Sequence, residues 1–170
     1  MKKVEHILEL MIFNSRWLLV PYYLGLVLAI ALLLVKFVKE FIGFVEVIFW
    51  GSSTDVVIGV LTLIDVVLLS NLLLIIIFAG YENFVSKIDT GDSEDRPSWM
   101  GKVTFSDLKM KLIGSIVAIS GIELLKAFVE VGNGSLTHED LAWKVGIHMT
   151  FVVTGLLFAL SDWFAYDKKK

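Results

Sequence analysis

The sequence predicts an all-α fold, a bundle of four transmembrane helices with an amphipathic N-terminal helix at the membrane interface. Two observations predict this class. Of the 170 residues, 56% are hydrophobic and 19% are charged, and the mean hydropathy is +0.78. A soluble domain carries about 45–50% apolar and about 25% charged residues. The apolar residues also form runs close to the length of about 20 that a membrane-spanning helix needs.

The first two spans are predicted at residues 17–37 and 56–80. The first begins with 19 positions that carry no charge, and the second contains one charged residue, Asp65. Residues 53–55 (Ser-Thr-Asp) precede the second span and are good N-cap candidates. Between the two spans, aromatic residues crowd the expected outer connection, where they favour an interfacial belt over a binding site; they are Phe37, Phe41, Phe44, Phe49 and Trp50.

The third and fourth spans are predicted at residues 110–131 and 144–165. The third is charge-free over only 11 consecutive residues, 112–122, so a buried or re-entrant segment is the alternative. A hydrophilic cytoplasmic linker, residues 81–104, separates two helical hairpins. Two capping boxes, Thr104 with Asp107 and Thr137 with Asp140, predict that the last two helices begin outside the bilayer.

Residues 1–14 are predicted to form the interfacial helix. Apolar residues recur there at helical spacing beside charged ones; they are Val4, Ile7, Leu8, Met11 and Ile12. The alternative is that this segment extends the first span, and periodicity alone does not separate the two.

The distribution of lysine and arginine predicts that both termini are cytoplasmic, because positively charged loops stay inside. With four spans, eleven basic residues fall on the side of the termini and four on the other. The three lysines 168–170, directly after the fourth span, are cytoplasmic only if the number of spans is even.

Several functional classes are excluded or disfavoured by composition. The chain has no cysteine, so disulfides and thiolate chemistry are absent. Its net charge of −3 gives no support for a nucleic-acid partner. His6, His138 and His148 follow no metal-binding spacing, and no phosphate loop, dinucleotide or nucleophile motif occurs. We therefore expect no cofactor, no metal site and no enzymatic activity.

Four acidic, basic or histidine side chains lie at least four residues inside the ends of the predicted spans, where each is costly and suggests a function; they are Asp65, Glu123, Lys126 and His148. Asp65 and Glu123 lie about 14 and 12 Å from the outer edge, so their depths match. One interpretation is a polar pathway that ends at this carboxylate pair and takes up a proton or cation. The other is that Lys126 neutralises Glu123 and Asp65 hydrogen-bonds a neighbouring helix.

A stripe of small residues in the third span, Gly114, Ala118 and Gly121, lies opposite Glu123. Such stripes allow close approach of another backbone in a membrane. Together with the small amount of polar loop, this stripe predicts a compact bundle that assembles as a homo-oligomer.

Four stretches of the chain resemble the YqhA family of bacterial inner-membrane proteins. They are Ser15–Leu19 running into Pro21–Tyr23, Gly80–Ser86 (GYENFVS), Ser115–Ser120 and Ile147–Val152. The resemblance implies a small multi-pass protein of the bacterial cytoplasmic membrane, without an established activity. It draws attention to Tyr81, Glu82 and Asn83 at the inner membrane edge, which could cap the second span, contact the N-terminal helix or bind a partner.

The function expected from these observations is that of a structural or interaction subunit of the membrane, in contact with lipid and with copies of itself. The alternative is an oligomeric channel or a proton or cation pathway that uses Asp65 and Glu123. No small-molecule ligand is identified.

Overall fold

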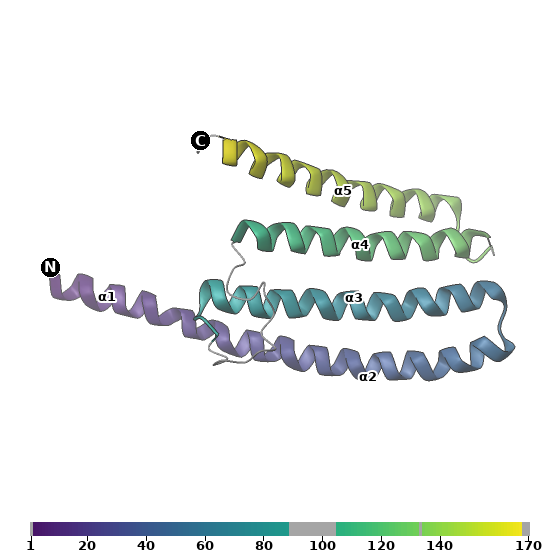
Figure 1. Cartoon of the computed structure of the whole chain (residues 1–170), viewed down its shortest axis with the longest axis horizontal. Coiled ribbons are helices and arrows are strands. Elements are labelled where there is room, and N and C mark those ends of the chain that lie inside the picture. Colours follow the sequence, from purple (N-terminus) through teal and green to yellow (C-terminus); the bar gives the residue numbers. More distant parts are fainter. Residues whose placement is uncertain (1, 89–104, 133, 168–170) are drawn as a thin grey trace.

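The structure is a computed structural model that describes residues 2–88, 105–132 and 134–167 (Figure 1). The described residues form five α-helices and one 3₁₀ turn, without a strand. They are α1 (Lys2–Ser15), the 3₁₀ turn η1 (Arg16–Leu19), α2 (Val20–Trp50), α3 (Ser53–Phe84), α4 (Phe105–Gly132) and α5 (His138–Asp167). Four helices of the described chain are long and apolar enough to cross a membrane. The predicted all-α class with four long apolar helices is therefore confirmed.

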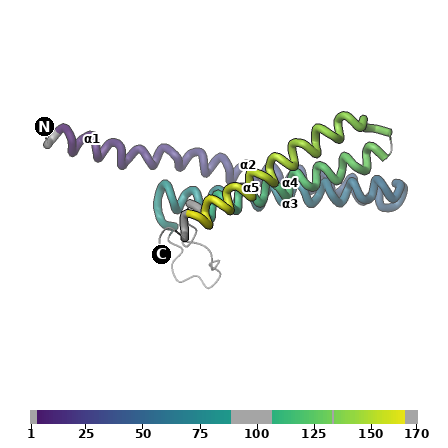
Figure 2. The backbone as a smooth tube through the Cα atoms, turned by 90° about the horizontal axis from the view of Figure 1, so that it is seen from above, coloured from purple at the N-terminus to yellow at the C-terminus, as the bar shows by residue number. Residues whose placement is uncertain are grey.

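The four long helices are antiparallel and lie in a row, in the order α2, α3, α4, α5 (Figure 1). Each contacts its neighbours in the chain, and α2 has no contact with α4 or α5 in the described part. Viewed from above, α5 crosses the other helices at an angle, so the row is twisted (Figure 2). The arrangement thus differs from the compact bundle expected from the sequence, because no contact closes the row into a ring.

The row has two ends. At the hairpin end, short connections join α2 to α3 and α4 to α5; at the linker end, α3 ends and α4 begins (Figure 1). The N-terminal helix α1 projects past the linker end, almost in line with α2 (Figures 1 and 2). The backbone stays helical through η1, with φ −59° and ψ −22° at Ser15 and φ −80° and ψ −21° at Leu19. Of the two interpretations of residues 1–14, this geometry fits the extension of the first span. A helix lying along the membrane interface would require a bend between α1 and α2.

The helices are longer than the predicted spans. α2 runs to Trp50 instead of residue 37, so the expected outer connection with its aromatic residues is helical except for Gly51 and Ser52. The prediction ended the helix where charged residues begin, but charge ends only the apolar run. No proline lies between Phe37 and Gly51, and the single glycine there, Gly43, is accommodated inside the helix. α3 likewise extends to Phe84, into the start of the predicted linker.

Capping side chains begin two of the helices. Ser52 is the N-cap of α3, one residue before the predicted candidates, and forms a capping box with Asp55. Thr137 and Asp140 form the predicted capping box before α5, with the Asp140 N–H donating to the Thr137 hydroxyl at 3.2 Å. Thr104 lies outside the described residues, and α4 begins directly after it.

The core is thin and follows α3. Few described side chains are buried, and most of those belong to α3 or to its C-terminal end; the buried apolar residues are Leu61, Val66, Ile77, Ala79, Val85, Leu108 and Ala127. A helix in a row has at most one neighbour on each side. The two broad faces of the row, above and below the plane of the helices, are therefore not covered by other described helices of the chain. Lipid or further protein must cover them.

Candidate functional site

Lys126 of α4 joins the two intramembrane carboxylates. Its Nζ lies 2.8 Å from Glu123 Oε1, three residues away on the same helix, and 3.5 Å from Asp65 Oδ2 of α3. The Lys126 side chain is only 12% exposed, against 28% for Asp65 and 46% for Glu123. The ammonium group therefore occupies the centre of the cluster, and both carboxylates lie at its edge.

This geometry follows from helix periodicity and from the long lysine side chain. Residues three apart on an α-helix are neighbours on its surface, which pairs Glu123 with Lys126. Asp65 and Glu123 have matching depths in the sequence, yet Asp65 meets Lys126, which starts about one turn nearer the hairpin end. Thr62, the polar neighbour of Asp65 on α3, donates its hydroxyl to the Ile58 carbonyl instead of joining the cluster.

The cluster combines two carboxylates with one ammonium group, so it has a formal charge of −1 when all three are ionised. Lys126 takes the position that a cation would need between Asp65 and Glu123. In the described part of the chain, no group of three histidine, aspartate or glutamate side chains is placed to hold a metal ion.

His148 of α5 belongs to a separate contact. Its Nδ1 lies 2.9 Å from the Ser120 hydroxyl of α4, and a Cβ placed on Gly121 would lie 3.5 Å from its Cε1. The imidazole therefore packs against α4 and uses its hydrogen bond to join two helices. Ser120 was not singled out by the sequence analysis, although its hydroxyl is one of the few polar groups in the third span.

The small-residue stripe on α4 is divided between two environments. Gly121 faces His148 of α5, whereas Gly114 and Ala118 are exposed, and a Cβ on Gly114 would meet nothing within 4 Å. Nearer the linker end, α5 meets α4 through other residues, since a Cβ placed on Gly155 would lie 3.4 Å from the Ile113 side chain.

Asn71 of α3 lies on the same broad face as Gly114 and Ala118, and we call this surface the Asn71 face. All three line an open hollow of about 540 Å³ between α3 and α4. Asn71 also lines a second hollow of about 530 Å³ between α2 and α3. Its amide is exposed and has no hydrogen-bond partner in the described parts of the chain. A search of the spans for ionisable residues does not find Asn71, because its amide is neutral.

The three residues at the end of α3 have distinct contacts. The Tyr81 ring packs edge-on against Tyr23 of α2, with the ring centroids 6.0 Å apart, and the Tyr81 carbonyl accepts from the N–H groups of Val85 and Ser86. The Asn83 amide donates to the Ala79 carbonyl at 2.7 Å. Glu82 is partly buried. Tyr81 thus contacts α2.

Residues 12–128, well over half of the chain, match the family described as "Uncharacterized protein family, UPF0114". The chain belongs to this family. The resemblance to the YqhA family noted from the sequence is confirmed by this match. No solved structure matches the chain.

The UPF0114 match covers α2, α3 and α4 as far as Phe128. It therefore includes the Asp65–Lys126–Glu123 cluster and the Asn71 face, but not His148. The family carries no assigned activity.

Proposed function

We propose that the protein is a homo-oligomeric subunit of the bacterial cytoplasmic membrane, with a structural or interaction role and no catalytic role. In this proposal the linker end and both termini face the cytoplasm, as the lysine and arginine distribution predicts. The described structure supports a multi-pass membrane protein through its four long apolar helices.

The exposed amide of Asn71 is the observation that carries this proposal. Asn71 lies eight residues before Ala79, the end of its apolar run, so it is about 12 Å inside the membrane. A polar group in hydrocarbon without a partner costs several kcal/mol. An amide both donates and accepts, so two Asn71 side chains related by a two-fold axis satisfy each other.

The surroundings of Asn71 also suit a second copy of the chain. Gly114 and Ala118 leave room for close approach, and small residues are enriched where membrane helices associate. Within the described ranges, no contact closes the row into a ring, so pairing through the Asn71 face covers a surface that these residues leave open.

Self-association can be tested by single-molecule photobleaching of labelled protein in lipid vesicles over a range of dilutions. Asn71→Leu should weaken association by about threefold to thirtyfold, because interhelical hydrogen bonds in membranes contribute about 0.6–2 kcal/mol. Asn71→Gln should retain most of it. Thr150→Val is a matched control, since the Thr150 hydroxyl donates to Gly146 of its own helix. A wild-type protein that stays monomeric at high protein-to-lipid ratios would contradict the proposal.

The second candidate is a proton or cation pathway through an oligomer, and the 46% exposure of the Glu123 side chain favours it. A carboxylate that reaches the surface within a span needs water, a partner or a proton. In vesicles, Asp65→Asn and Glu123→Gln should then change the flux of protons or cations while oligomers persist. Flux no greater than that of empty vesicles would remove this candidate.

A further inference from the structure

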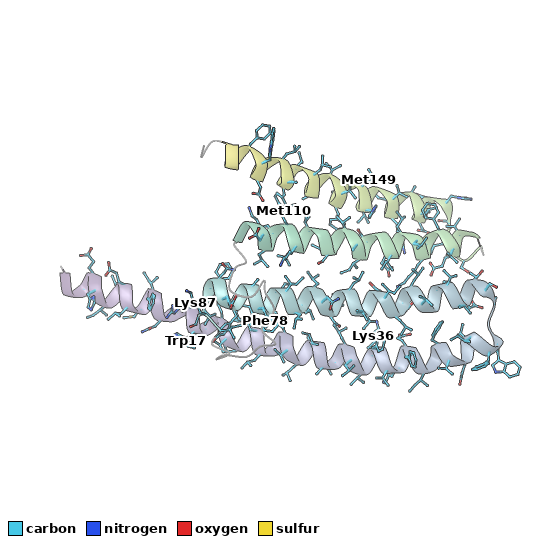
Figure 3. The ribbon with its side chains drawn as sticks, viewed as in Figure 1. Trp17, Lys36, Phe78, Lys87, Met110 and Met149 are labelled. Atoms are coloured by element: carbon cyan, nitrogen blue, oxygen red, sulfur yellow. The ribbon has the colours of Figure 1, made fainter. Side chains whose placement is uncertain are left out.

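At the linker end, a pocket of about 370 Å³ opens between the start of α2 and the end of α3. Tyr23, Tyr81 and Lys87 provide the polar part of its lining, and Leu24, Val27 and Ile77 provide apolar surface. Figure 3 shows Lys87 and Phe78 at this position beside the first turns of α2. Its volume is within the range of about 300–1,000 Å³ that is typical of small-molecule sites.

The pocket is polar at the membrane edge and apolar toward the membrane interior. Val27 lies seven residues beyond Val20 along α2, so the lining extends about 10 Å along the helix axis. Lys87 follows the end of α3 and belongs to the edge. A molecule that matches this gradient has a polar head and an apolar chain.

The polar groups of the pocket are hydrogen-bond donors without partners. Neither tyrosine hydroxyl, of Tyr23 or of Tyr81, has a hydrogen bond within the described ranges, and no described carboxylate pairs with Lys87. A Cβ on Gly80 would lie 2.8 Å from the Tyr23 hydroxyl oxygen, so this hydroxyl reaches across to α3 next to Tyr81. Three donors, one of them cationic, thus line one pocket.

A second cation lies close to the same edge. Arg16 is one turn before Val20, the first residue of the lining, and its guanidinium lies 4.0 Å from the centre of the Phe13 ring. Its Nε is buried and has no hydrogen-bond partner among the described residues. Glu82, the acidic neighbour of Tyr81, does not line the pocket. The charge at the pocket is therefore complementary to an anion.

We propose that this pocket binds an anionic phospholipid of the inner leaflet, with its phosphate at Lys87 and the two tyrosine hydroxyls and part of an acyl chain against Leu24 and Val27. Basic pockets between transmembrane helices on the cytoplasmic side bind such headgroups. The assignment to the inner leaflet rests on the proposed orientation, with the linker end in the cytoplasm. It does not depend on the oligomeric state.

The test is native mass spectrometry of the detergent-solubilised protein titrated with phosphatidylglycerol or with phosphatidylcholine. Wild type should bind phosphatidylglycerol more tightly. Lys87→Gln should weaken that binding by about fivefold, the effect of one lysine near an anionic surface, and leave phosphatidylcholine binding unchanged. Tyr23→Phe combined with Tyr81→Phe should also weaken phosphatidylglycerol binding, because the rings remain and the donors are lost.

Lys36→Gln is the matched control, because Lys36 lies on α2 nearer the hairpin end (Figure 3). It should bind phosphatidylglycerol as wild type does. A thermal melt of each variant without added lipid shows that it is folded. Equal wild-type affinity for the two lipids, or equal losses in Lys87→Gln and Lys36→Gln, would overturn the proposal. Asn71→Leu, diluted until it is monomeric, tests independence from oligomerisation. Lipid selectivity that persists there would show that this site does not need the oligomer, and loss of selectivity would overturn that independence.

Discussion

Replacing Lys126 with methionine removes the only cation in contact with Asp65 and Glu123 among the described residues. Methionine keeps a long unbranched side chain, so the substitution changes charge more than packing. Two carboxylates then remain within the membrane spans without a partner. We expect the folded protein to be destabilised.

The magnitude follows from the two distances. At an effective dielectric constant of about 20, unit charges 2.8 and 3.5 Å apart attract each other by about 6 and about 5 kcal/mol. Desolvation of the three groups offsets most of this attraction. Breaking a buried pair by removing one partner costs about 3–5 kcal/mol, and the exposure of Glu123 reduces that cost. The free energy of unfolding of Lys126→Met should therefore be lower by about 2–4 kcal/mol.

The assay is reversible unfolding in detergent micelles with a chemical denaturant, followed by circular dichroism. A triple variant that combines Lys126→Met with Asp65→Asn and Glu123→Gln tests the cause. It should recover more than half of the lost free energy, because no unpaired charge remains. Lys36→Met is the control for loss of a lysine outside the cluster and should stay within about 0.5 kcal/mol of wild type.

The electrostatic explanation would be refuted if Lys126→Met unfolds at the wild-type denaturant concentration. It would also be refuted if the triple variant is as unstable as the single one, since the loss would then arise from packing.

Three further substitutions test individual contacts by the same unfolding assay. Gly59→Ala should lower the free energy of unfolding by about 1–3 kcal/mol, because its Cβ would overlap the ring of Phe44. Ser120→Ala should cost about 0.5–1.5 kcal/mol through loss of the bond to His148, made at 2.9 Å. Thr137→Ala should cost about 1 kcal/mol, because the first turn of α5 loses the hydroxyl that accepts from it at 3.2 Å.

Each of these has a matched control. Gly43→Ala adds a Cβ where nothing lies within 4 Å and should be neutral or stabilising. Among the described residues, the hydrogen-bond partner of the Ser115 hydroxyl is the Lys111 carbonyl of the same helix, so Ser115→Ala should cost less than Ser120→Ala. Ser135→Ala, in the same connection as Thr137, should have little effect. If a control lowers the free energy of unfolding as much as its test variant does, the contact named for that variant is not the cause of its loss of stability.

Much of the helical architecture is local and was predicted from the sequence. The four apolar runs mark the helices that can cross a membrane, and the Thr137–Asp140 box marks the start of one of them. Helix ends were less accurate where charged residues follow an apolar run. The extension of α2 to Trp50 is the main case, because hydropathy measures where lipid ends and not where a helix ends.

The candidate site was predicted in part. Glu123 and Lys126 are three residues apart, so their pairing follows from one helix alone. The contact between Asp65 and Lys126 requires knowing which faces of α3 and α4 meet. Likewise, only the way α4 packs on α5 shows that Gly121 lies against His148 while Gly114 is exposed.

The sequence by itself determined three properties. They are the preference of the helices for lipid surroundings, the number of helices long and apolar enough to cross a bilayer, and the contacts between residues one helical turn apart. Only the tertiary structure decided that the helices form an open row, that Lys126 contacts two carboxylates and that the Asn71 side chain is exposed on the surface of this row. The physical reason is that lipid is as apolar as leucine. Hydrophobicity therefore does not distinguish a helix face that packs on protein from one that faces the bilayer, and that choice depends on packing between segments far apart in the chain.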